Sequence, residues 1–249
     1  MIVSIAKKAY NKLGTNFFAN NSPTHHFHSD DYLRHTARRL EHLASLRIPV
    51  SGMSVLEVGA GIGDHSNYYI DRGCDITITE TRRENLDHLV SRYPGASVLH
   101  LDLDTPDRLL NGPFDIVHCY GTLYHLKNPE LALAFLGQAC SKILFLETCV
   151  SFGEDEEINL VKESQKNPSQ AYSGIGCRPT RPWILSRLRR DFKYVYIPVT
   201  QPNHEEFPLD WTQPEIHQGL SRSIFIASKT ELRNDLLTTE LLHHQTRHE

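Results

Sequence analysis

From residue 54 onward, short runs rich in β-branched residues alternate with segments whose apolar positions recur at helical spacing. This alternation predicts strands joined by helices, and therefore a mostly parallel sheet covered on both faces. The expected strands occupy residues 54–58, 75–79, 97–101, 115–119, 142–147, 192–197 and 223–228. The expected helices between them occupy residues 63–71, 83–92, 129–139 and 181–191. The pattern indicates an α/β fold with a seven-stranded, doubly wound sheet.

Residues 1–50 predict an N-terminal helical cap that precedes the sheet. Residues 3–13 have the length and composition of a short helix. A second helix is expected to begin after Ser29, whose hydroxyl suits the N-cap position. Asp30 and Asp31 follow in its first turn, where carboxylates interact favourably with the helix dipole.

Two stretches of chain are longer than ordinary connections between neighbouring elements. They cover residues 150–182, after the fifth strand, and residues 198–222, which carry four prolines. Loops longer than ~12–15 residues are usually functional or irregular, so we expect both insertions to form a substrate lid. No helical pattern joins the last two strands, which favours an antiparallel final strand. Residues 230–249 predict a polar tail with a loosely attached helix, and residues 1–249 together form a single domain.

The composition and charge of the chain argue against several classes of protein. The chain has 249 residues, a net charge of −4 and no run near the ~18 apolar residues of a membrane span. Its negative charge disfavours non-specific binding to nucleic acid. Its five cysteines include no CxxC pair, which indicates neither a disulfide framework nor a zinc knuckle, and the cytoplasm is the expected location. Histidines cluster near both ends, where we expect a solvated surface, with metal binding as the alternative.

The first predicted strand runs into a glycine-rich turn, Glu57-Val-Gly59-Ala60-Gly61-Ile-Gly63-Asp64. In a doubly wound sheet this turn lies at the carboxyl edge, where such folds bind ligands. The carboxylates of Glu57 and Asp64 flank the turn and would repel a pyrophosphate, which disfavours NAD and ATP. They suit a ligand that carries a positive amine or sulfonium and no phosphate.

This turn resembles motif I of the class I S-adenosylmethionine-dependent methyltransferases. Glu80 ends the second strand, where that family has an acid for the ribose hydroxyls. Asp102 and Leu103 follow the third strand, where the family has an acid for the adenine amino group and an apolar neighbour. Asp104 is the alternative acid. The segment 114–121 resembles motif IV of the same family.

The resemblance implies a Rossmann-like fold with S-adenosylmethionine as cofactor and S-adenosylhomocysteine as product. It also implies a set of residues that contact the cofactor: Glu57, Gly59, Ala60, Gly61, Gly63, Glu80, Thr81, Asp102, Leu103 and Tyr120. The implied activity is methyl transfer to an oxygen or nitrogen atom. The size, acidity and insertions of the chain favour a small-molecule substrate, as in metabolism or natural-product biosynthesis, and a monomer or homodimer.

Two other classes of function stay open. Residues 121–125 and 144–148 are similar to segments of the tRNA wobble-uridine carboxymethyltransferases, and a weaker similarity extends to Trp183 and Trp211. An RNA or protein methyltransferase is therefore the alternative, although only the stretch 178–193 offers the basic face that nucleic acid requires. A non-catalytic partner subunit is the third class.

His125 is the best candidate for a general base, because it follows the fourth strand at the edge where the methyl group should point. Its ordinary pKa near 6.5 suits proton transfer around neutral pH. A purely structural role for His125 is the alternative, and Tyr124 and Glu147 are reserve candidates. No metal is expected, because the fourth strand ends in Cys119-Tyr120-Gly121 and offers no carboxylate to a hard cation.

The first insertion and the following loop supply the candidate substrate contacts. Arg178 and Arg181, braced by prolines beside Trp183, would suit a carboxylate, a phosphate or an aromatic ring. Trp211 in the second insertion is the fourth candidate. In the alternative interpretation Trp183 packs in the core and the arginines are solvated.

Overall fold

A computed structural model describes residues 23–106 and 112–248. The helix predicted over residues 3–13 lies outside the described residues. Among those residues, no helix is both long enough and apolar enough to cross a membrane.

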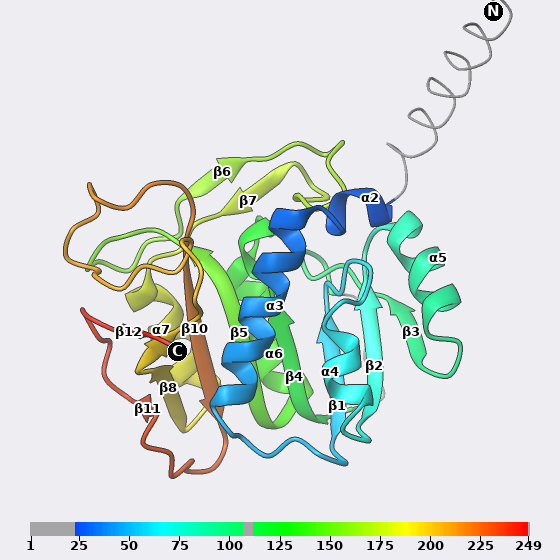
Figure 1. The fold of residues 1–249 in the computed structure, drawn as a ribbon, viewed down its shortest axis with the longest axis horizontal. Helices are drawn as coiled ribbons and strands as arrows, with labels where there is room; N and C mark the ends of the chain where they lie inside the picture. Colours follow the sequence, from blue (N-terminus) through cyan, green and yellow to red (C-terminus); the bar gives the residue numbers. More distant parts are fainter. Residues whose placement is uncertain (1–22, 107–111, 249) are drawn as a thin grey trace, which may run out of the picture.

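The centre of the molecule is an eight-stranded sheet in the order β11-β8-β10-β5-β4-β1-β2-β3 (Figure 1). Its strands are β1 (Ser54–Val58), β2 (Asp75–Glu80), β3 (Ser97–His100), β4 (Phe114–Tyr120), β5 (Cys140–Val150), β8 (Tyr194–Pro198), β10 (Ser221–Ser228) and β11 (Leu237–Thr238). Strands β1 to β5 pair in parallel, whereas β10 runs antiparallel to both β5 and β8. All seven predicted strands and the antiparallel final strand of that set are confirmed, and β11 adds a short edge strand.

Helices cover both faces of this sheet. The cluster of buried side chains on one face includes residues of α6 (Pro129–Ala139) and α7 (Arg181–Asp191). The cluster on the other face includes residues of α3 (Asp30–Ser45), α4 (Ser66–Ile70) and α5 (Arg83–Arg92). The predicted bounds of α5, α6 and α7 are confirmed. The helix expected over residues 63–71 is shorter, because the glycine turn continues to residue 65.

Helix α3 begins where the sequence predicts. The hydroxyl of Ser29 accepts a hydrogen bond from the backbone N–H of Tyr32, and Asp30 and Asp31 occupy the first turn. The short helix α2 (Pro23–Phe27) precedes it. In Figure 1, α3 crosses the sheet in front of β4 and β5. It carries the buried polar side chains His35, Arg39 and His42 toward the sheet, so this helix contributes chemistry as well as packing.

Both insertions have secondary structure of their own. The first contains the antiparallel hairpin of β6 (Leu160–Lys162) and β7 (Ile175–Cys177), and in Figure 1 this hairpin lies above the upper end of the sheet. The second contains β9 (Thr200–Gln201), which pairs in parallel with β12 (Thr246–Arg247).

The predicted helix of the tail is wrong for residues 231–248, which contain β11 and β12 but no helix. The tail is extended because its backbone completes the edges of β8 and β9. Gln245, for example, is buried, donates to the carbonyl of Pro198 and accepts from the indole of Trp211. These contacts tie the tail to the sheet, so it is not loosely attached.

Candidate functional site

The glycine turn after β1 forms the floor of the site. Gly59 and Gly61 have φ angles of 61° and 59°, in the left-handed region that favours glycine. A Cβ on Gly59 would collide with the side chain of Thr122, and one on Gly61 would come within 3.1 Å of Phe27. The two glycines therefore let Thr122 and Phe27 pack closely against the turn.

Glu80, at the end of β2, is held by three backbone donors. Its Oε2 accepts from the N–H of Gly61 at 2.9 Å, and its Oε1 accepts from those of Thr81 and Arg82 at 3.0 and 2.9 Å. Burial raises the pKa of Glu80, although these three bonds oppose the shift by stabilising the carboxylate. The carboxylate is fixed in position beside the glycine turn, where it can accept hydrogen bonds from hydroxyl groups.

A cavity, here called the Glu80 cavity, opens over this carboxylate. The residues that line it include Glu80, Thr81, Arg82, Asp102, Leu103 and His125. The hydroxyl of Thr81 is buried and has no hydrogen-bond partner among the described residues, so it can bond a ligand in this space. Gly59, Gly61, Glu80 and Thr81 thus fit an adenosine group, and Leu101, Leu103 and Leu126 add apolar surface to the same cavity.

The two neighbouring aspartates after β3 have different roles. Asp104 is buried and its Oδ1 accepts from the backbone N–H groups of Lys127 and Asn128, at 2.8 and 2.9 Å. Asp102 is half-buried and caps its own turn through the N–H of Asp104. Asp104 is therefore engaged with the segment after β4, and Asp102 is the less buried of the two carboxylates that line the Glu80 cavity.

A second cavity, here called the Arg39 cavity, shares Gly59, Gly61 and Gly121 with the Glu80 cavity. It is lined by residues that include Arg39, Glu57, Gly59, Ala60, His65 and Tyr120. Burial raises the pKa of Glu57 to about 7, and a hydrogen bond from the Ser66 hydroxyl opposes that shift. The phenol of Tyr120 is buried without a partner among the described residues. A cation and a carboxylate that face one space suit a zwitterionic amino-acid group.

His125 belongs to a hydrogen-bonded triad with the first insertion. Its Nδ1 lies 2.5 Å from Oε2 of Glu163, and Oε1 of Glu163 accepts from Nη2 of Arg178 at 3.1 Å. Burial lowers the pKa of His125, and the hydrogen bond to Glu163 opposes that shift. The ring is therefore neutral near pH 7, and its Nε2 makes no hydrogen bond to the described part of the chain.

Glu147 is enclosed between two arginines in the core. Its Oε2 accepts from Nη1 of Arg39 at 2.9 Å and its Oε1 from Nη1 of Arg222 at 3.0 Å, and the side chain is fully buried. Burial favours the neutral acid, but Arg222 and Arg39 outweigh it and hold the pKa of Glu147 below its ordinary value. A carboxylate with both oxygens engaged is a poor proton acceptor, which argues against Glu147 as the base. Tyr124 accepts at its hydroxyl from Arg222, at 3.2 Å.

The largest space beside His125, of about 430 Å³, is here called the His35 cavity. Its lining includes His35, Tyr124, His125, Glu163, Glu206 and Arg222. It shares Tyr32, His125, Ser169 and Gln170 with the Glu80 cavity, so the two spaces meet at His125. Leu220 is the only aliphatic side chain among the described residues that line it.

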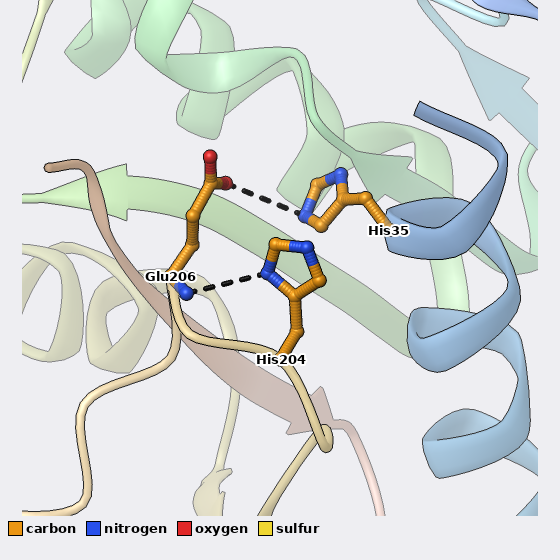
Figure 2. Close-up of side chains that lie close together, drawn as sticks. All are labelled: His35, His204 and Glu206. Carbon is orange, nitrogen blue, oxygen red and sulfur yellow. Dashed lines mark hydrogen bonds and ion pairs between the residues drawn. The ribbon is translucent and has the colours of Figure 1, made fainter. Parts of the chain in front are cut away.

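Figure 2 shows the group of His35, His204 and Glu206 at this cavity. Each offers a ligand atom, and these atoms lie within 4.8 Å of one another. However, Oε2 of Glu206 accepts from Nε of Arg222 at 2.5 Å, and Nδ1 of His204 accepts from the backbone N–H of Glu206 at 3.3 Å. Because protein donors occupy both positions, we interpret the group as a hydrogen-bonding cluster, and the absence of a metal stays a prediction.

Three of the four predicted substrate contacts lie away from the three cavities. Trp183 is 2% exposed and packs in the core on α7. The guanidinium of Arg181 lies 3.9 Å from the ring centre of Trp211 and donates to the carbonyl of Leu242. Burial lowers the pKa of Arg181 to about 9. These side chains stabilise the second insertion and the tail, and only Arg178 lines the His35 cavity.

Gly63 also differs from its expected role. A Cβ there would lie 2.5 Å from the ring of Tyr93 and 2.8 Å from Leu89, and Gly63 lines none of the three cavities. It allows the turn to pack against α5. Ala60 lines the Arg39 cavity.

The polar residues that complete the site were not predicted from the sequence. Arg39 and His35 come from the helix after Ser29, Glu163 from the hairpin of the first insertion, and Glu206 and Arg222 from the second insertion and β10. The one available signal was the polarity of α3, where His35, Arg39 and His42 recur at helical spacing on the buried face.

Comparisons with known proteins agree with this geometry. A family model described as a methyltransferase domain matches residues 29–189. No curated protein sequence matches the chain.

Many solved structures share the fold, and three are described here. The N-terminal domain of EvdMO1, crystallised with S-adenosylhomocysteine and D-fucose, has 20% identity and a TM-score of 0.61 over 78% of this chain and 82% of its own. An S-adenosylmethionine-dependent methyltransferase from Mesorhizobium loti has 16% identity and a TM-score of 0.56, over 78% and 99%. The 1,6-didemethyltoxoflavin-N1-methyltransferase of Burkholderia thailandensis, with substrate and S-adenosylhomocysteine bound, has 18% identity and a TM-score of 0.52, over 90% of both chains.

Proposed function

We propose that this chain, which belongs to the class I S-adenosylmethionine-dependent methyltransferases, methylates an oxygen or nitrogen atom of a small molecule bound in the His35 cavity. The observation that carries the proposal is the position of His125, which lines both this cavity and the Glu80 cavity. A methyl acceptor must lie next to the methyl donor, and the two spaces meet at this side chain.

The residues around the glycine turn fit the methyl donor. When bound, S-adenosylmethionine supplies an electrophilic methyl group on a sulfonium. The carboxylate of Glu80 suits the two ribose hydroxyls, and the unpartnered hydroxyl of Thr81 lies in the same cavity. Arg39, whose Nε has no partner among the described residues, and Glu57 line one cavity and suit the carboxylate and the ammonium of the methionine group.

The acceptor contributes the nucleophile, and the protein contributes position and a base. Methyl transfer is an in-line displacement at carbon, so holding the two reactants in contact supplies a large share of the rate. We assign the base to Nε2 of His125, which takes the proton of the acceptor as the bond to carbon forms. Glu163 holds Nδ1 and stabilises the imidazolium that results.

The properties of the His35 cavity support a small acceptor. Its volume of about 430 Å³ lies within the usual range of ~300–1,000 Å³ for small-molecule sites. It is roofed by the hairpin, since Ser169, Gln170 and Arg178 from the first insertion line it. Two proteins of the same fold were crystallised with D-fucose and with 1,6-didemethyltoxoflavin, which are small cyclic molecules.

An acceptor search tests this proposal. The protein is incubated with radiolabelled S-adenosylmethionine and, in separate reactions, with a small-molecule extract, bulk tRNA and a protein extract. We expect label in the small-molecule fraction, in a product whose mass is raised by one methylene group. The control is His125→Asn with its affinity for S-adenosylhomocysteine measured separately. Label that accumulates in tRNA or protein instead would contradict the small-molecule assignment.

A further inference from the structure

The cations on the wall of the His35 cavity are already paired. Arg178 donates to the carbonyls of Tyr124 and Cys177 and to Glu163. Arg34, whose side chain is 45% exposed, donates through Nη2 to Glu205.

Arg222 is committed in the same way. Its Nε donates to Glu206, its Nη1 to Glu147 and its Nη2 to the hydroxyl of Tyr124. Of the arginines that line the cavity, Arg178 and Arg222 are therefore committed to several protein acceptors, whereas exposed Arg34 bonds only Glu205 among the described residues.

One polar atom in the lining of the His35 cavity lacks a hydrogen-bond partner among the described residues. Nε2 of His35 is buried and has no hydrogen-bond partner in the described part of the chain, and the side chain is 9% exposed. Oε2 of Glu206 lies 3.6 Å from this nitrogen, which is too long for a hydrogen bond (Figure 2). The other oxygen of Glu206, Oε1, makes no hydrogen bond to any residue that the structure describes.

A ligand hydroxyl group can hydrogen-bond both His35 Nε2 and the carboxylate of Glu206. It can accept from an imidazole N–H or donate to an unprotonated nitrogen, and in either case it can also bond the carboxylate. Burial lowers the pKa of His35, and Arg39 and Arg222 lower it further, so the ring is neutral and retains one acceptor nitrogen. A carboxylate placed against His35 would instead be repelled by Glu206, and the neighbouring Arg222 already donates to Glu206, Glu147 and Tyr124.

We propose, on the premise that the chain methylates a small molecule in this cavity, that the acceptor is a neutral polyhydroxylated molecule. One hydroxyl bridges His35 Nε2 and the Glu206 carboxylate, while another polar group meets His125. A sugar ring has this character, because it presents several hydroxyls on a compact scaffold.

Binding of matched sugars to the protein saturated with S-adenosylhomocysteine tests this inference. The probes are neutral methyl glycosides of several configurations and the uronate counterpart of each, followed by saturation-transfer NMR at millimolar concentration. We expect at least one neutral glycoside to bind and its uronate to bind about tenfold more weakly. His35→Ala and Glu206→Gln should each weaken the neutral glycoside by about tenfold, the scale of a lost hydrogen bond to a charged partner. The exposed His243→Ala serves as the matched control and should bind like the parent.

The outcomes separate the inference from the proposed function. The inference would be overturned if the uronates bound as well as the neutral sugars or if no glycoside bound. It would also be overturned if both variants bound the glycoside like the parent, because only a water would then bridge His35 and Glu206. Affinity for S-adenosylhomocysteine is measured on every variant, so a folding defect is recognised. Failure of the parent protein to bind S-adenosylhomocysteine would overturn the proposed function itself.

Discussion

Nδ1 of His125 and Oε2 of Glu163 lie 2.5 Å apart, although 38 residues separate them in the chain. His125 belongs to the 3₁₀ turn η1 (Leu123–His125) after β4, and Glu163 belongs to the hairpin of the first insertion. The backbone N–H of Ala171 also donates to Oε2 of Glu163, at 2.7 Å, so the hairpin holds the carboxylate against the ring. The insertion thus completes the proposed base as well as covering the cavity.

Replacement of Glu163 should change the pH dependence of turnover. Glu163 raises the pKa of His125, so Glu163→Gln should lower that pKa and move the acidic limb of the kcat profile to lower pH. The plateau should also fall, because the imidazolium loses its counter-charge. Glu163→Asp should recover part of the activity. A profile that keeps its shape in Glu163→Gln would show that the carboxylate only closes the hairpin.

Replacement of Glu80 should weaken the methyl-donor site. Glu80→Gln keeps the size of the side chain but loses the charge, and the affinity for S-adenosylhomocysteine should fall by roughly 1.5–3 kcal/mol. Isothermal titration measures this loss, with the exposed Glu84→Gln on α5 as the control. Unchanged affinity in Glu80→Gln would remove Glu80 from the ribose role.

Replacement of Glu147 should lower the free energy of unfolding. Glu147→Gln leaves Arg39 and Arg222 buried beside a neutral amide, and breaking a buried ion pair costs about 3–5 kcal/mol in the free energy of unfolding. Denaturant titration measures this loss in the free energy of unfolding. The matched control is Glu130→Gln, whose surface pairs with Arg187 and Arg190 should be worth no more than about 1 kcal/mol. Equal losses in the two variants would contradict the account of the buried network.

The same network predicts a loss of stability in acid. Because the folded pKa of Glu147 lies below the ordinary value of 4.5, its contribution is fully present above that pH. The contribution disappears as the pH falls through the folded pKa, because the unfolded chain then binds the proton more readily than the folded one. Glu147→Gln should therefore flatten the decline of the unfolding free energy below pH 4.5. A decline as steep as in the parent would assign the acid sensitivity to other carboxylates.

Methyl transfer should need no divalent metal. The end of β4 offers Cys119, Tyr120 and Gly121, and a hard cation prefers carboxylate oxygens. Activity should therefore survive dialysis against a chelator. Activity that disappears in the chelator and returns with Mg²⁺ would overturn this prediction.

The strands and helices that depend on a local sequence pattern could be predicted from the sequence. Alternating apolar runs placed the seven strands, and the cap at Ser29 placed the start of α3. The glycine turn and Glu80 are neighbours of the first two strands, so the topology of a parallel sheet brings them together. The prediction of a helix in the tail was wrong because the extended form of the tail depends on pairing with the edges of β8 and β9, which no local sequence pattern encodes.

The contacts of the acceptor side could not be predicted for the same reason. Glu163 contacts His125, and Glu206 lies 3.6 Å from His35, through tertiary contacts between segments that are distant in the chain. Trp183 and Arg181 were misassigned because an arginine beside a tryptophan has the same local sequence whether it faces a ligand or packs in the core.

The most direct test of the central claim is the turnover of the identified acceptor by His125→Asn and His125→Ala between pH 6 and 9, with affinity for S-adenosylhomocysteine checked for each. A general base contributes ~10²–10⁴-fold, so we expect kcat to fall by that order while the affinity for S-adenosylhomocysteine stays close to that of the parent. Turnover within about threefold of the parent across this range would contradict the account, because position alone would then carry the reaction and His125 would only shape the junction of the two cavities.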